Sequence, residues 1–541
     1  MRTARTREKM GPGSARWRGQ RRRSMAALVV GCALLAGPVA SALPTYAVPQ
    51  KSGTNTPTPD EPGAIPKGLE SFYSQEVSWY PCGDTGGIQK TDEQGKFSCA
   101  TVTVPMDYSQ PDGKTIQVAV KKRAADGEPR GSLFINPGGP GGSGIGLVEA
   151  VGKSFSKDLL AGYDVVGFDP RGVGSSTPIT CQDAKPAEEA SAEHPQEESS
   201  FENWAQGYMD EVSKLEKQCR EYSEPGLLDH VGTALVARDL DVLRAVSGEK
   251  TLNYLGMSYG TELGYTYAEL FPHNTGRLVL DGAMDSTSTN HRLTVETAEG
   301  YEKALHRYVQ ACLEGKAGDN CPLTGSVEDG VQQIRDLITS ANASPLKTSD
   351  PDVKITGAQL TGAIRRYLSG GAWPQLTAAL APAIGQNDAS GFAEAVKQAS
   401  AGVSMAAWTA VMCQDRPAQG NMDAWKAQYE ETQKVAPTFA GGASFDMTCA
   451  AWGHYSKTDP IPQNVHAKGA APILVVGTTG DPATPYHWAQ ALAKQLDSAQ
   501  LITWEGNAHV AYTHGNKCIK TAIDNFLLDG QLPEDNLVCT S

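Results

Sequence analysis

The sequence of 541 residues lacks three features that would each define a class of protein. It has no excess of positive charge: 47 Lys and Arg stand against 61 Asp and Glu, and this formal charge of −14 argues against nucleic-acid binding. It has no C-x-x-C or H-x-x-x-H spacing, so no metal site is predicted. After residue 42 it has no unbroken apolar run of about 18 residues, so no stable membrane insertion is expected.

The first 42 residues differ from the rest of the chain in charge. They hold nine Arg or Lys and one Glu, and without them the formal charge is −22. Arg21–Arg23 precede an apolar run from Met25 to Ala40, and Ala40–Ala42 is a small-residue cleavage site. This is the pattern of a secretory signal peptide over 1–42, and it predicts a secreted, extracellular protein. A membrane anchor or a lipoprotein site at Cys32 is the alternative interpretation.

Cysteine usage agrees with export. Ten of the eleven cysteines follow residue 42, and an even number in an exported chain indicates disulfides. Ten cysteines allow about 945 pairings. The simplest scheme pairs nearest neighbours along the chain: Cys82–Cys99, Cys181–Cys219, Cys312–Cys321, Cys413–Cys449 and Cys518–Cys539.

The pattern of apolar runs predicts an α/β fold. Residues 43–68 are rich in Pro, Thr, Ser and Gly and are interpreted as a linker or removable pro-segment. Beyond them, short apolar runs followed by turn residues predict buried strands. These runs are Ser132–Asn136, Tyr163–Asp169, Leu252–Gly256, Leu278–Asp281, Ile473–Gly477 and Leu501–Glu505.

Helical periodicity between some of these runs, as in Thr233–Val246 and Thr261–Phe271, favours a mostly parallel central sheet. Strand-like runs become rare over 286–460, where Ala-rich sequence predicts a largely helical lid insertion. The core is therefore expected in two parts, 69–285 and 461–541.

The most informative motif is G-x-S-x-G at Gly256–Gly260, with a predicted strand before it and a predicted helix after it. This context is typical of a nucleophile elbow, in which a tight turn raises the serine above the sheet and its neighbours must be small. Ser258 is therefore the candidate nucleophile. A chance match in a loop would lack the flanking strand and helix.

Serine needs an adjacent base, and in this architecture the acid and then the histidine follow it in the chain. Asp481 lies in the turn after the predicted strand Ile473–Gly477. Among ten histidines, His509 is the one that follows the next strand and a glycine turn, with His514 as the second choice. We predict that His509 accepts the Ser258 proton and that Asp481 orients its ring.

The second motif is the glycine-rich loop Asn136–Gly144, directly after a predicted strand. Its backbone N–H groups are suited to an oxyanion hole, with one donor from Gly139 and the other from Tyr259. The same loop contains G-x-G-x-x-G, a dinucleotide-binding pattern. Two prolines, a weak helix start after Gly144 and the serine-hydrolase residues elsewhere argue against that alternative.

A third loop, Asp169–Ser176, contains Arg171. We expect Arg171 to pair with a buried carboxylate and support the site, the alternative being an ordinary surface turn.

Together these motifs, with Leu280–Gly282, Gly480–Pro485 and Gly506–His509, resemble the secreted tripeptidyl aminopeptidases of Streptomyces. These are α/β-hydrolase serine peptidases related to proline iminopeptidases, and the similarity extends over 77–539. The resemblance implies a Ser258–Asp481–His509 triad and release of tripeptides from free N-termini. It implies no cofactor, and a monomer acting on peptides is expected.

An exopeptidase of this kind needs a group for the substrate ammonium. Asp415 and Glu262 are the candidate carboxylates, with a purely structural role as the alternative for each. The alternative functions are a secreted carboxylesterase with the same triad, an aminopeptidase that releases single residues, and an inactive binding module.

Overall fold

The computed structural model describes residues 62–181, 200–442, 444–453 and 459–540, without the side chains of 399–402. The predicted signal peptide and most of the predicted linker lie outside the described residues. The described chain is built on a ten-stranded sheet of order β1-β2-β3-β5-β4-β6-β7-β10-β11-β12. The strands are β1 (Tyr80–Pro81), β2 (Phe97–Pro105), β3 (Thr115–Arg123), β4 (Ser132–Asn136), β5 (Asp164–Phe168), β6 (Leu252–Met257), β7 (Thr275–Asp281), β10 (Ile473–Thr478), β11 (Ala499–Glu505) and β12 (Val538–Thr540).

The sheet is parallel from β5 to β12, whereas β1, β2 and β3 pair antiparallel with their neighbours. All six predicted strands are present, and the mostly parallel sheet is confirmed. The antiparallel strands at the N-terminal edge were not predicted.

Helices cover both faces of the sheet because its central strands are apolar on both sides. One apolar cluster joins Phe134 and Val166 to α6 (Thr233–Val246), α7 (Tyr259–Leu270) and α16 (Tyr486–Gln495). Another joins alternate strand residues to α2 (Gly144–Ser154), α3 (Lys157–Gly162) and α18 (Lys517–Asp529). The short helices α1 (Glu70–Tyr73) and α17 (Ala511–His514) and the long α5 (Phe201–Tyr222) complete this part.

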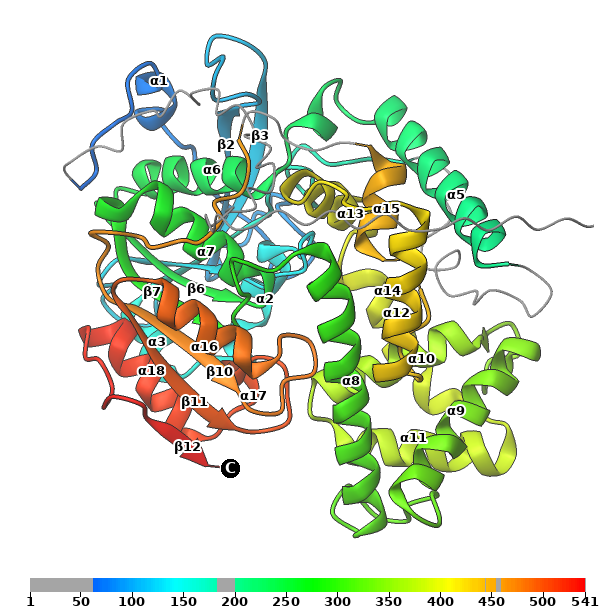
Figure 1. Cartoon of the computed structure of the whole chain (residues 1–541). Helices are drawn as coiled ribbons and strands as arrows, with labels where there is room; N and C mark the ends of the chain where they lie inside the picture. Colours follow the sequence, from blue (N-terminus) through cyan, green and yellow to red (C-terminus); the bar gives the residue numbers. More distant parts are fainter. Residues whose placement is uncertain (1–61, 182–199, 443, 454–458, 541) are drawn as a thin grey trace, which may run out of the picture. The chain divides into compact units, whose positions relative to one another are not determined.

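Between β7 and β10, which are neighbours in the sheet, the described residues form helices joined by loops, together with the small hairpin of β8 (Leu346–Lys347) and β9 (Lys354–Ile355). Figure 1 shows these helices gathered beside the sheet. They are α8 (Asn290–Leu313), α9 (Val327–Ala343), α10 (Gly357–Ser369), α11 (Trp373–Gln386), α12 (Ser390–Gly402), α13 (Met405–Asp415), α14 (Met422–Val435) and α15 (Phe445–Trp452). We call this segment the insertion.

The insertion has two kinds of packing. Helices α8 to α12 share an apolar cluster of their own, which includes Leu305, Ile334 and Leu360. Helices α13 and α15 instead contribute Met412 and Trp452 to the cluster of the sheet and α6. One half of the insertion is therefore a separate layer, and the other half is continuous with the core.

The five predicted disulfides are confirmed, since each pair of neighbouring cysteines is bonded as expected. Among the described residues, no helix has the length and apolar character needed to cross a bilayer.

Candidate active site

Ser258 lies in a tight turn between β6 and α7, as the motif predicts. Its φ of 57° is in the left-handed region, and its N–H donates to the Asp281 carbonyl at 2.8 Å. The glycines on either side permit this turn: a methyl group on Gly256 would come within 2.3 Å of the Gly260 carbonyl oxygen, and one on Gly260 within 2.8 Å of the Asn136 carbonyl oxygen. Strain of this kind at a non-glycine residue is typical of functional sites.

Asp481 and His509 meet at the ends of β10 and β11. The His509 Nδ1 lies 3.0 and 2.9 Å from the two carboxylate oxygens of Asp481. The backbone N–H groups of Ala483 and Thr484 donate to the same carboxylate, and the Thr484 hydroxyl donates to it at 3.0 Å. The carboxylate is therefore held in one orientation, with the histidine ring fixed against it.

The charge around His509 favours its protonated form. Burial lowers the pKa of His509, but the charge and hydrogen bond of Asp481, together with the Asp281 charge, outweigh burial, so the pKa is raised above its ordinary value. The Asp481 carboxylate therefore stabilises the imidazolium form of His509.

Asp281 joins the serine turn to the histidine loop. Its carbonyl accepts the Ser258 N–H, and its carboxylate accepts the N–H groups of Ala511 and Tyr512 at 2.8 and 2.7 Å. Val510, which lies between His509 and Ala511, has φ 72°, a strained value for a β-branched residue. A methyl group on Gly282 would lie 3.2 Å from the His509 ring. Asp281 thus holds the backbone that carries His509, and burial raises its pKa to about 6.

The glycine-rich loop lies against the serine turn. A methyl group on Gly138 would come within 2.9 Å of the Ser258 Cβ and 3.0 Å of the Tyr259 nitrogen. Gly138 and Gly139 have φ of 92° and 115°, which only glycine adopts readily. In the described part of the chain, the N–H groups of Gly139 and Tyr259 donate no hydrogen bond. Both predicted donors are free to meet a substrate oxygen.

The helix after this loop differs from the prediction. α2 begins at Gly144 itself, and the Ser143 hydroxyl accepts the Gly146 N–H as its cap. The expected weak helix start was therefore wrong, because Ser143 supplies the cap that the glycines do not. The Ser143 hydroxyl also donates to the buried carboxylate of Asp169 at 2.6 Å, which ties this turn to the next loop.

Arg171 is buried and forms a two-pronged ion pair with Asp239 of α6, at 2.7 and 2.6 Å. Its remaining donors reach the carbonyls of Pro105, Met106 and His230. The predicted pairing with a buried carboxylate is present, and it fastens the Asp169–Ser176 loop to the core.

Glu262 and Asp415, the candidate ammonium ligands, both have internal partners. Glu262 is fully buried on α7 and forms a two-pronged ion pair with Arg416. Asp415 accepts the N–H and the hydroxyl of Thr233 at the start of α6, and burial raises its pKa, with the Glu262 charge acting in the same direction. These contacts connect the core to the insertion, and the ammonium-binding role stays a prediction.

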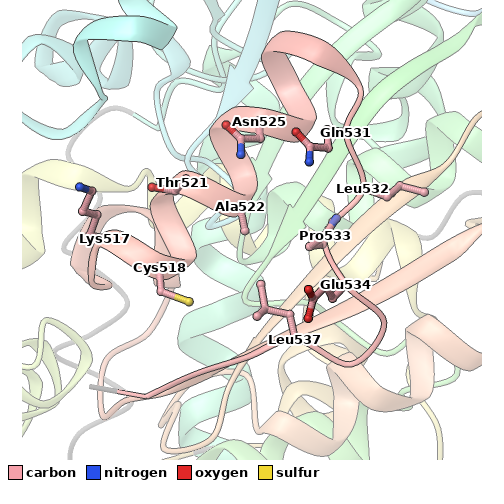
Figure 2. Close-up of a pocket in the computed structure, with 10 residues that line it drawn as sticks. All are labelled: Lys517, Cys518, Thr521, Ala522, Asn525, Gln531, Leu532, Pro533, Glu534 and Leu537. Atoms are coloured by element: carbon pink, nitrogen blue, oxygen red, sulfur yellow. The ribbon is translucent and has the colours of Figure 1, made fainter.

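A cavity of about 120 Å³ lies between α5, α8, α10, α14 and the start of α15. Its wall contacts the acid loop directly, since the Thr297 hydroxyl donates to the Ala483 carbonyl at 3.3 Å. A larger cavity of about 470 Å³, shown in Figure 2, is lined by α18 and residues 531–537 and contains none of the predicted site residues.

Sequence reasoning missed several residues that support the site. Thr484 has a local signal, because an Asp followed three residues later by Thr is a common self-bonding turn. Asp281 was noted only as part of a motif. Ser369 and Arg307 of the insertion have no sequence signal, yet the Ser369 carbonyl accepts the His509 N–H at 2.7 Å, and Arg307 donates to the Gly480 carbonyl at 2.8 Å.

The fold and this arrangement define a serine hydrolase of the α/β-hydrolase class. The family model described as alpha/beta hydrolase fold matches residues 131–320, and the one described as TAP-like protein matches residues 436–539. The chain belongs to the α/β-hydrolase family that includes the tripeptidyl aminopeptidases of Streptomyces.

Three curated relatives illustrate the range of this family. The serine protease Hip1 of Mycobacterium tuberculosis is 33% identical over 489 residues, 87% of this chain and 92% of the relative. Carboxylesterase B of the same species is 34% identical over 542 residues, 97% of this chain and 99% of the relative. The tripeptidyl aminopeptidase of Streptomyces lividans is 32% identical over 495 residues, 86% of each chain.

Proposed function

We propose that this chain is a secreted serine exopeptidase that releases tripeptides from the free N-termini of peptides through an acyl-enzyme, acting as a monomer without a cofactor. The observation that carries the hydrolase chemistry is the arrangement of Ser258 on its strained turn, the bonded His509–Asp481 pair and the two free N–H groups. The peptide assignment is supported by the similarity to the Streptomyces aminopeptidase.

In this mechanism the Ser258 oxygen attacks the scissile carbonyl while His509 Nε2 accepts its proton. Asp481 keeps the other ring nitrogen protonated and stabilises the imidazolium. The N–H groups of Gly139 and Tyr259 bind the oxyanion, and loss of one such donor costs about 3–4 kcal/mol in the transition state. His509 then protonates the leaving amine. In the second half of the cycle it activates the water that releases the acyl group and regenerates Ser258.

A secreted carboxylesterase is the second candidate, favoured by the similarity to carboxylesterase B over nearly the whole chain. An aminopeptidase that removes single residues is a third. The three share the triad and differ in what the insertion admits, so substrate length and charge separate them.

The test is product analysis by mass spectrometry on one unblocked peptide of ten residues and its N-acetylated twin. Loss of three-residue units from the free peptide alone is the expected result. Release of single residues indicates an aminopeptidase with a shorter substrate pocket. Cleavage of both the free and the N-acetylated peptide indicates an endopeptidase. Cleavage of an aryl ester with neither peptide cut contradicts the proposal. The Ser258→Ala variant controls for contaminating peptidases.

The export step has a separate test. The N-terminal sequence of protein recovered from the culture medium should begin after Ala42, or after residue 68 if the linker is a pro-segment. Protein that stays with the cells and begins at Met1 would contradict secretion.

A further inference from the structure

Arg365 of α10 is a cation that contacts aromatic rings but has no acidic partner among the described residues. Its guanidinium lies over the Tyr301 ring, 4.4 Å from the centroid, and 5.8 Å from that of Phe439. Its side chain is half-buried and its Nε is shielded from solvent, yet within the described part of the chain Arg365 forms no hydrogen bond and no ion pair. Buried donors are nearly always bonded, so this guanidinium is a favourable site for an acceptor group.

Arg365 lines the cavity of about 120 Å³ described above. It is the one charged side chain among the described residues that form the wall; the others are aromatic, aliphatic or small polar groups such as Phe445, Tyr429 and Thr297. A cation between aromatic walls attracts a carboxylate and repels an ammonium group. The volume corresponds to about four water molecules at ~30 Å³ each, enough for a carboxylate with a short apolar stem.

The wall of the cavity contacts one loop of the proposed active site directly and is linked to the two others through intervening residues. Thr297 contacts the acid loop through Ala483. The Tyr301 hydroxyl, under Arg365, shares a hydrogen bond with the Ser369 hydroxyl at 2.8 Å, and the Ser369 carbonyl accepts the His509 N–H.

On the third side, Phe445 packs against Trp408 with ring centroids 5.2 Å apart. The Trp408 nitrogen would lie 3.2 Å from a methyl group on Gly141. These contacts link the wall of the cavity to the loops that carry the proposed catalytic residues.

We propose that this cavity is a subsite in which Arg365 binds a carboxylate of the substrate, making the enzyme selective for negatively charged substrates. This rests on the proposed function only in that Ser258 is taken as the nucleophile. Two parts of the substrate can supply this carboxylate. One is an acidic side chain in the released segment, and the other is the C-terminal carboxylate of a short leaving peptide.

The experiment compares the wild-type enzyme with Arg365→Met and with the matched control Arg366→Met, whose guanidinium is exposed and bonds Gln398. The substrates are two series of unblocked peptides. In the first series, each pair of peptides has either Glu or Gln at one of the first three positions. In the second series, a short peptide has either a free C-terminal carboxylate or a C-terminal amide. The wild-type and Arg366→Met enzymes should prefer one acidic member at least about tenfold in kcat/KM. Arg365→Met should bring that ratio close to one and keep the rate on the neutral member.

The position of the preferred carboxylate identifies its source. A preference for Glu places an acidic side chain in the cavity, and a preference for the free acid places the leaving peptide there. Equal rates for every acidic and neutral pair in the wild-type enzyme overturn the proposal without any variant. A preference that survives Arg365→Met also overturns it, and Arg365→Lys, which keeps the charge, should retain part of the preference.

Ester substrates distinguish failure of the peptidase assignment from failure of the carboxylate subsite. If no peptide is cut, aryl esters of butyrate and of hemisuccinate replace the peptides. A preference for hemisuccinate that depends on Arg365 supports the carboxylate subsite on an esterase, and equal rates overturn it there too.

Discussion

The core and the insertion differ in what their sequence patterns determine. Strands β4 and β10 are buried along their whole length, and each positions one functional loop by where it ends. The insertion helices α9 and α10 are amphipathic and bury one face in their own cluster. Under the proposed function, the core places the reacting groups and the insertion forms the walls around the substrate. Changes in the core should abolish chemistry, and changes in the insertion should alter selectivity or stability.

The largest expected effect is that of Ser258→Ala. Removal of a nucleophile of this kind lowers kcat by about 10⁶-fold, leaving the residual effect of binding and the oxyanion donors. The thermal unfolding midpoint should be unchanged or raised, because the strained turn accepts alanine as well as serine. Loss of fluorophosphonate labelling together with loss of peptide cleavage checks it, and substantial remaining activity would refute the nucleophile assignment.

The next effect is that of Asp481→Asn, which should lower kcat by about 10⁴-fold because the His509 ring is no longer held in the productive tautomer. The sign of the pH effect follows from the raised pKa of His509. Catalysis needs neutral His509, so activity falls as pH drops through that pKa. Without the Asp481 charge the pKa decreases, and the acid limb of kcat/KM should move to lower pH.

The matched control is His514→Ala. The His514 Nδ1 contacts the Val510 carbonyl at 3.2 Å, and burial lowers its pKa. Activity within a few-fold of wild type is expected. A loss of activity as large as that of His509→Ala would identify His514, and not His509, as the base that accepts the serine proton.

Glu262→Gln breaks one ion pair between the two regions. It leaves the Arg416 charge buried without its partner, a change that costs about 3–5 kcal/mol of unfolding free energy. Removing both charges with Glu262→Met and Arg416→Met should cost less. Urea denaturation measures the difference. The same variant tests the ammonium role of Glu262: a raised KM for free-amine peptides, with stability kept and KM for aryl esters unchanged, would favour substrate binding.

The smallest difference is expected between two disulfides of the insertion. The Cys413–Cys449 bond joins residues 36 apart, and the Cys312–Cys321 bond joins residues 9 apart. Chain-entropy arguments give about 4 kcal/mol for the longer loop and about 3 kcal/mol for the shorter one. Paired alanine variants should therefore lose stability in that order in thermal unfolding. The reverse order would show that packing of α13 and α15, or of α8, determines the cost.

The parallel strands could be predicted because their apolar runs are uninterrupted, and the elbow could be predicted because glycine, serine and a helix start coincide. β3 could not, because it carries charged residues that are nonetheless buried, such as Lys121, which pairs with Glu149. In the sequence such a strand resembles a surface segment, because the residue that pairs with its buried charge is known only from the structure.

The same reason limits what the sequence says about the site. Ser258, Asp481 and His509 each follow a recognisable strand, so their positions could be inferred locally. Arg365 and Ser369 lie on an ordinary amphipathic helix. What distinguishes each of them is the residue that it contacts, and the packing of the insertion determines that residue.

The order of the disulfides has a consequence for how the chain matures. Because the ten cysteines after residue 42 are bonded in consecutive pairs along the sequence, every bond can close once its second cysteine has entered an oxidising compartment. No correct bond has to wait for a distant partner or cross another. A chain threaded from its N-terminus can thus acquire its covalent framework in the order of its synthesis, with little need for isomerisation of wrong pairs.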